Sequence, residues 1–219
     1  MRIETLVRIG IVAKMASEGW TLLGQDSETV RFTTGGSAIG DCDLHINIEV
    51  REARTWLNPI VGLYNAKTAE LFTAFLGLPP SRTAVVGSTL ADLLHQQGHH
   101  DAPVPRWSVR SEADIATILQ ALASDLAIYG VPYIRAFREV EDVAVELNRV
   151  GLNQLDSGRL AVLYAVDGRM ERAVASLTHF GRAAQVQAGS VADQSKNFIR
   201  AFARHFGIED QLPFVLQGG

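Results

Sequence analysis

The stretch from Cys42 to Arg51 reads CDLHINIEVR, and apolar and polar side chains alternate along it. Because successive side chains of a β-strand point to opposite faces, this alternation predicts a strand with one face in the core. We expect the core face to carry Cys42, Leu44, Ile46, Ile48 and Val50. The opposite face would carry Asp43, His45, Asn47, Glu49 and Arg51.

Shorter strands are expected on both sides of this stretch. Residues 21–24 and 29–33 flank a polar connection of hairpin length, and the glycine-rich run 35–40 is typical of a flexible loop. Further strands are predicted downstream at residues 60–64, 82–86 and 106–110. These segments predict a mainly antiparallel sheet of about four to six strands.

Helices are expected around this sheet in the first half of the chain. Apolar side chains at helical spacing predict an opening helix over residues 3–20. Asn65 can cap a helix that ends at Leu76, before Gly77 and a pair of prolines. A third helix is expected over residues 89–97.

The second half of the chain has the pattern of a helical region. Ser111 and Asp114 form a capping-box-like start, and the apolar stripe that follows is closed by Gly130. Another helical stretch begins at Pro132, residues 151–158 interrupt it, and further helices reach about Gly207. We therefore expect an α+β fold with a sheet-bearing half over 1–110 and a helical half over 111–219, packed together as one unit.

Composition excludes several classes of protein. With 219 residues and 47% hydrophobic content, the chain can bury a sizeable core. A net charge of -4 disfavours general nucleic-acid binding, because no broad positive field is available to neutralise phosphates. No signal peptide and no run of about 20 apolar residues is recognised, so no membrane association is expected. The lone cysteine, Cys42, cannot form an internal disulfide, and this favours a reducing cytoplasm.

The polar face of the 42–51 strand is the first place to look for catalysis. His45, Glu49 and Arg51 could act as a base, an acid and an anion clamp, since alternate residues lie roughly 7 Å apart along a strand. A solvated or cross-strand-paired sheet face explains the same pattern without any chemistry. Cys42 lies between Asp41 and Asp43, which disfavour a thiolate, so we expect a quiet structural thiol and not a nucleophile.

Metal and cofactor sites are not expected. His95 and His99 have the four-residue spacing of helical zinc ligands, and His100 and Asp101 follow, but Gly98 should end the helix between the two histidines. We interpret these residues as a surface loop. The sequence contains no phosphate-binding glycine loop followed by Lys-Ser/Thr, no dinucleotide fingerprint and no Gly-x-Ser-x-Gly motif.

Two charged stripes at helical spacing are candidates for partner binding. The first is acidic and consists of Glu139, Asp142 and Glu146. The second is basic, consists of Lys196, Arg200 and Arg204, and lies opposite Phe198, Phe202 and Phe206. Each stripe can be the solvated side of an amphipathic helix, and either can dock a partner of opposite charge.

One segment resembles the tetratricopeptide helix-turn-helix unit. The resemblance rests on the run LAVLY at residues 160–164, with Gly168, Ala173, Leu177 and Phe180 after it. Steps of 34 residues in either direction do not regenerate the signature, so one hairpin is implied and not a solenoid.

The run DLAIYGVPY at residues 125–133, with the acidic helix and the hairpin after it, resembles bacterial proteins of the polymorphic-toxin immunity type. The resemblance implies a non-enzymatic protein that binds another bacterial protein, as an immunity protein or antitoxin that blocks a toxin. Two alternatives stay open: a small hydrolase or transferase that uses His45, Glu49 and Arg51, and a secretion or assembly chaperone with a peptide groove.

Overall fold

The computed structural model describes residues 2–99, 106–185 and 190–211. Contacts within the chain group it into two compact units. The first unit consists of Met1–Leu63 and Gly87–Arg138, and the second of Tyr64–Val86 and Glu139–Gly219. Each unit is thus assembled from two separate segments, whereas the sequence predicted one boundary near Ser111.

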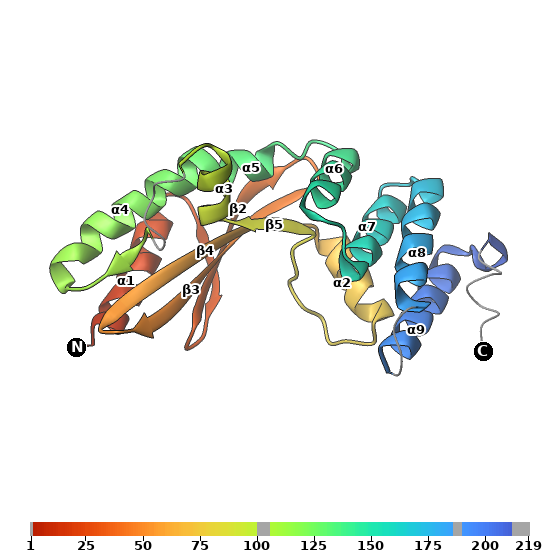
Figure 1. Cartoon of the computed structure of the whole chain (residues 1–219), viewed down its shortest axis with the longest axis horizontal. Helices are drawn as coiled ribbons and strands as arrows, with labels where there is room; N and C mark the ends of the chain where they lie inside the picture. Colours follow the sequence, from red (N-terminus) through yellow and green to blue (C-terminus); the bar gives the residue numbers. More distant parts are fainter. Residues whose placement is uncertain (1, 100–105, 186–189, 212–219) are drawn as a thin grey trace. The chain divides into compact units, whose positions relative to one another are not determined.

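The first unit contains the sheet, which has six antiparallel strands within the described residues (Figure 1). The order is β1-β2-β3-β4-β5, and β6 lies beside β4. This sheet and the helices of the second half confirm the α+β class. The strands are β1 (Thr21–Gln25), β2 (Thr29–Ser37), β3 (Gly40–Arg51), β4 (Arg54–Tyr64), β5 (Val86–Thr89) and β6 (Ser108–Val109).

Strand β3 has the predicted alternation over most of its length. Leu44 and Ile46 are fully buried, and each lies opposite an apolar residue of β2, Phe32 and Val30. The two ends of the pattern differ from the prediction, because Asp43 is only 2% exposed and Val50 is 58% exposed. The cover on the core face therefore ends before Val50, close to the turn into β4.

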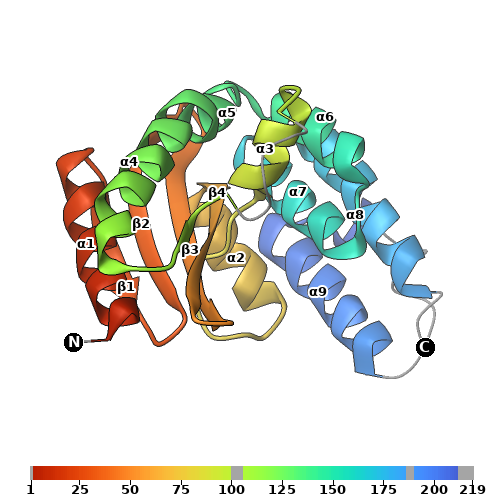
Figure 2. The same ribbon diagram turned by 60° about the vertical axis from the view of Figure 1, so that its left-hand side comes forward.

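Helices cover the core face of the sheet. Helix α1 (Ile3–Ser17) contacts β1 and β2, and α5 (Val131–Arg135) contacts β2 and β3. Helix α4 (Ile115–Asp125) packs on α1, and Figure 2 shows both along one side of the sheet. The two helices approach closely at Gly10, where an added Cβ would lie 2.8 Å from a methyl carbon of Leu119.

The helix that contains α4 does not end at Gly130, so this expectation was wrong. A short 3₁₀ turn with the expected Ser111/Asp114 capping box precedes α4, and a π-helical turn, Leu126–Gly130, carries the helix on into α5. Pro132 lies just after the π-helical turn, at the start of α5, so the change in hydrogen-bond pattern coincides with the residue that has no N–H to donate. The combined stretch Glu112–Arg135 is the one helix in the described part of the chain that is long and apolar enough to cross a membrane. Helices in protein cores meet the same criterion, and this one contributes buried side chains to the core.

Helices form the second unit. They are α2 (Ala66–Phe75), α6 (Val140–Val150), α7 (Gln154–Val166), α8 (Met170–Gln185) and α9 (Ser190–Phe206). Helix α3 (Leu90–Gln96) follows α2 in the chain but belongs to the first unit. Asn65 caps α2 as predicted, since its side chain accepts a hydrogen bond from the Thr68 N–H.

The core of the second unit is built from phenylalanine rings of three helices. The Phe198 ring lies 4.7 Å from that of Phe180 and 5.5 Å from that of Phe72, measured between ring centroids. Phe202 and Phe75 extend the cluster, at 5.8 Å from each other. Edge-to-face and tilted ring pairs of this kind add to the stabilisation from burial.

Helices α7 and α8 form a hairpin whose turn contains Gly168, with a φ of 80°. Ala161 and Ala173 are fully buried, as expected for small residues in a helix pair. The interruption predicted over residues 151–158 is shorter in the structure, because α7 already begins at Gln154. Gly158 lies inside this helix, where an added Cβ would lie 3.0 Å from the Phe180 ring, so its role is close packing.

Several strand boundaries differ from the sequence prediction. The expected glycine loop is reduced to a short turn, because β2 reaches Ser37 and β3 begins at Gly40. Strand β5 begins four residues after the predicted start at Arg82. Strand β4 begins at Arg54 and not at Ile60. The turn before it was missed because Glu52 and Ala53 are not typical turn residues, yet both have positive φ, 49° and 59°.

This β3–β4 turn generates a stability prediction. Side chains other than glycine in the left-handed region cost roughly 1 kcal/mol each, whereas Asn-Gly suits a two-residue hairpin turn with positive φ. We expect the double substitution Glu52→Asn, Ala53→Gly to raise the free energy of unfolding by about 1 kcal/mol. Urea denaturation measures the change; an equal or lower midpoint would contradict the left-handed turn.

Candidate functional site

The predicted catalytic residues lie on the face of β3 opposite the core. Glu49 and Arg51 form an ion pair with an N···O distance of 2.6 Å, and both side chains are largely exposed. His45 is half-buried and lies opposite Arg31 of β2. Exposed ion pairs contribute little to stability, so the Glu49–Arg51 pair is easily exchanged for other partners.

Two hollows in the first unit share Glu49 and Arg51. The smaller has a volume of about 360 Å³ and the larger about 600 Å³. His45 lines neither of them. The structure therefore brings two of the three predicted catalytic residues together and leaves the third outside these hollows.

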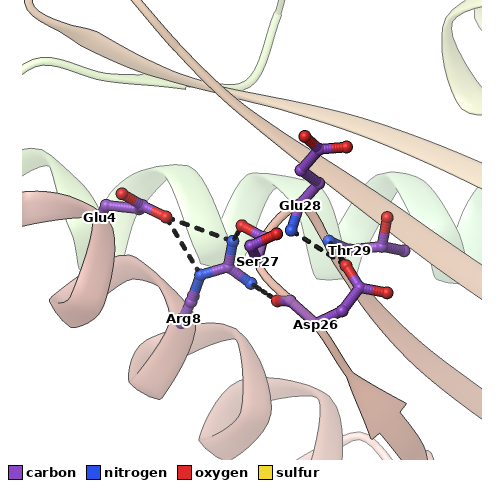
Figure 3. A network of polar contacts seen from close by, with 6 residues as sticks. All are labelled: Glu4, Arg8, Asp26, Ser27, Glu28 and Thr29. Atoms are coloured by element: carbon purple, nitrogen blue, oxygen red, sulfur yellow. Dashed lines mark hydrogen bonds and ion pairs between the residues drawn. The ribbon is translucent and has the colours of Figure 1, made fainter.

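The larger hollow is acidic, with carboxylates from Glu4, Glu28 and Glu49. Its wall includes the β1–β2 turn, which Arg8 of α1 holds by donating to the carbonyl oxygens of Asp26 and Ser27 (Figure 3). Arg8 also pairs with Glu4 at 3.3 Å, and Arg51 pairs with Glu49. Glu4 and Glu49 are thus each paired with an arginine of the same chain. This pairing disfavours an acid–base pair of the kind used in catalysis.

The Asp26 side chain also stabilises the β1–β2 turn. It accepts hydrogen bonds from the backbone N–H groups of Glu28 and Thr29, at 3.0 and 2.9 Å (Figure 3). These two donors lower the pKa of Asp26 below its ordinary value, because they stabilise the ionised form. The network in Figure 3 is therefore a structural support for the turn.

The smaller hollow lies beside β4 and combines tryptophan with arginine. Its lining includes Trp56, Trp107, Arg106 and Arg51. Behind it, the buried carboxylate of Asp125 accepts from the Trp107 indole N–H at 3.1 Å and from Arg106 Nε at 2.8 Å. Sequence analysis missed this group, although an aspartate inside the apolar stripe of α4 was a usable signal, since buried charges require partners.

Two of the histidines considered as metal ligands, His95 and His99, lie within the described residues. Gly98 has a φ of 87° and follows α3, so it ends this helix between His95 and His99 as expected. His99 Nε2 lies 2.9 Å from the hydroxyl of Tyr129. His100 and Asp101 lie outside the described residues. Among the residues that are described, no group of three or more side chains is placed to hold a metal ion.

Cys42 has the environment expected of a structural thiol. Its side chain is fully buried on the core face of β3. Burial, and after it the charge of Asp43, raise the pKa of this thiol to about 12. At neutral pH the thiolate required for nucleophilic attack is therefore almost absent.

The acidic stripe is engaged within the second unit. Glu139 and Asp142 form a capping box at the start of α6, in which each side chain accepts from a backbone N–H. Glu146 pairs with Arg149 through two contacts of 2.7 Å. Arg169, at the α7–α8 turn, pairs with Glu139 at 3.5 Å. These three acids therefore support the helix and its neighbours.

The basic stripe has a different setting. Arg200 and Arg204 are exposed on α9, Lys196 is half-buried, and within the described residues none of the three forms an ion pair or hydrogen bond. The opposite side of α9 carries the fully buried rings of Phe198 and Phe202. The cations are thus presented by a helix that is anchored in the core.

A serine and a histidine in the second unit lie close together without the geometry of a nucleophile. Ser157 Oγ lies 2.9 Å from His179 Nδ1, but its hydroxyl also donates to the carbonyl oxygen of Asn153 at 2.9 Å. Ser157 is fully buried, so no substrate can approach its oxygen. This contact links α7 to α8.

No model of a known protein family matches the chain, and no match is found among curated proteins or among solved structures.

The setting of Cys42 generates a prediction on reactivity. We expect native protein at pH 7 to react with a thiol reagent at least about a hundredfold more slowly than the chain in denaturant, because burial limits both access and thiolate formation. Absorbance with a chromogenic disulfide reagent measures both rates. Equal rates would show that Cys42 is not on the core face of β3.

Proposed function

We propose that this chain is a non-enzymatic protein-binding protein and that the basic face of α9, formed by Lys196, Arg200 and Arg204, contacts an acidic surface of its partner. The proposal rests on a difference in ion pairing between the two charged stripes. The acidic stripe has intramolecular partners, whereas the three cations have none within the described residues. A ligand of opposite charge can therefore bind the cations without first displacing an internal ion pair.

The packing of α9 supports this proposal. Phe198 and Phe202 hold the helix in the core, so the positions of the exposed cations on its backbone are fixed before a partner arrives. A preorganised surface loses less conformational entropy on binding. Charge complementarity also accelerates the encounter of two proteins and disfavours partners of the same charge.

The narrower role that we propose is that of an immunity protein or antitoxin, whose partner is a bacterial toxin in the cytoplasm. Its support is the resemblance of residues 125–133, and of the helices after them, to polymorphic-toxin immunity proteins. A secretion or assembly chaperone would bind extended peptides in a groove. In contrast, the face described here is a stripe along one helix, which is better matched to a folded acidic surface.

Charge reversal on α9 tests the proposal. We expect Arg200→Glu, Arg204→Glu to weaken capture of the partner by roughly tenfold or more, because two attractive contacts become repulsive. Quantitative pull-down from cells of the source bacterium, with mass spectrometry of the bound proteins, measures the effect. The free energy of unfolding should change by less than about 1 kcal/mol, since exposed charges contribute little to stability.

The matched control is Arg2→Glu, Arg110→Glu. These substitutions make the same change of charge at exposed positions of the first unit, ahead of helix starts where acids are well tolerated. This control should retain the partner. Equal capture by the parent and the α9 variant would refute the proposed surface, and turnover of a small molecule without any captured protein would refute the protein-binding role.

A further inference from the structure

The smaller hollow, lined by Trp56, Trp107, Arg51 and Arg106, has the features of a ligand site that the proposed partner surface does not use. Its volume of about 360 Å³ lies in the range of small-molecule pockets. The rest of the lining consists of Leu57, Ala91, Asn58 and Glu49. A mainly apolar wall with a few polar groups is typical of such pockets, because apolar contacts supply affinity and polar groups supply orientation.

Arg106 is held in a fixed position at this hollow. Its Nε lies 2.8 Å from one carboxylate oxygen of Asp125, and its Nη2 lies 3.3 Å from the other. A guanidinium has five N–H donors, and Asp125 takes two of them, so three remain for another acceptor. Asp125 is only 4% exposed, whereas the Arg106 side chain is 39% exposed, so the buried carboxylate holds a guanidinium that solvent and ligands can still reach.

The same carboxylate also positions one of the aromatic walls. Asp125 Oδ2 accepts from Trp107 Nε1, so one buried group fixes both the cation and a ring. Asp125 immediately precedes the π-helical turn Leu126–Gly130, and such turns occur frequently at functional sites. On the other wall, Trp56 donates its indole N–H to the carbonyl oxygen of Arg51 at 3.4 Å. The walls are therefore preorganised by hydrogen bonds.

We infer that this hollow binds a small aromatic carboxylate, whose ring packs on Trp56, beside the 2% exposed Trp107, and whose carboxylate accepts hydrogen bonds from Arg106. Arginine suits a carboxylate because its planar donors match the two oxygens. Arg51, at the rim, supplies a second cation when its exposed pair with Glu49 opens. The inference is independent of the α9 surface, since every lining residue belongs to the first unit.

The test uses the tryptophans as reporters. The chain has three, and the third, Trp20, does not line the hollow. Titration with 3-phenylpropionate should shift the indole N–H signals of Trp56 and Trp107 in ¹⁵N NMR spectra and leave that of Trp20 in place. Phenethylamine has a similar skeleton with a positive charge, so it should bind at least about tenfold more weakly.

Three variants locate the interaction. Arg106→Gln should weaken binding of 3-phenylpropionate by roughly tenfold to a hundredfold, through loss of the charged donors. Trp56→Ala leaves the Arg106–Asp125 ion pair in place and should also weaken binding. Arg31→Gln is the matched control, because Arg31 is similarly exposed, pairs with Asp26 at 3.6 Å and lies outside the hollow. It should bind as the parent does.

Several results would overturn the inference. These are no saturable shift of Trp56 or Trp107 up to about 10 mM ligand, binding of the amine as tight as that of the acid, and a shift confined to Trp20. Unchanged affinity in Trp56→Ala would also overturn it, even if Arg106→Gln failed to fold.

Discussion

The alternation of side chains along β3 is the constraint on which the first unit depends. Its period of two residues sends Leu44 and Ile46 to the face that α1 and α5 cover, and sends Glu49 and Arg51 to the other face. A shift of one residue in register would exchange these two sets and place charges in the core. The same phase buries Cys42, and it positions the ion pair that lines both hollows.

A second periodicity has the same effect in the other unit. Phenylalanines at helical spacing fix one side of α9 against rings from α2 and α8, so the arginines between them must point outward. The proposed partner surface is thus a consequence of how this helix is buried. In both units, the packing that stabilises the fold also decides which charged groups remain available for binding.

Periodic patterns predicted well what depends on local spacing. The phase of β3, the Asn65 cap, the Ser111/Asp114 capping box and the buried ring face of α9 all follow from residues near one another in the chain. The beginning of β4 was missed because Glu52 and Ala53 adopt a conformation that their side chains do not favour. Gly158 was interpreted as a break, whereas it is close to a ring 22 residues away in sequence.

The candidate ligand site was harder to predict, because its parts are distant in sequence. Trp56, Arg106 and Asp125 come from three separate segments, and only the paired sheet and α4 bring them together. A lone aspartate in an apolar stripe indicates that a buried partner exists, but it does not identify that partner. The sequence likewise did not show that the acidic stripe has intramolecular partners while the basic stripe has none within the described residues. Capping and ion pairing depend on where each helix begins.

Urea denaturation of two variants at adjacent positions of β3 tests the assignment of its two faces most directly. Ile46→Ala should lower the free energy of unfolding by about 2–5 kcal/mol, because it leaves a cavity in the core. Asn47→Ala, on the opposite face, loses a hydrogen bond with Thr29 and should cost about 1 kcal/mol or less. Losses of equal size, or a larger loss at Asn47, would contradict the assignment of faces from which both the core and the candidate site are derived.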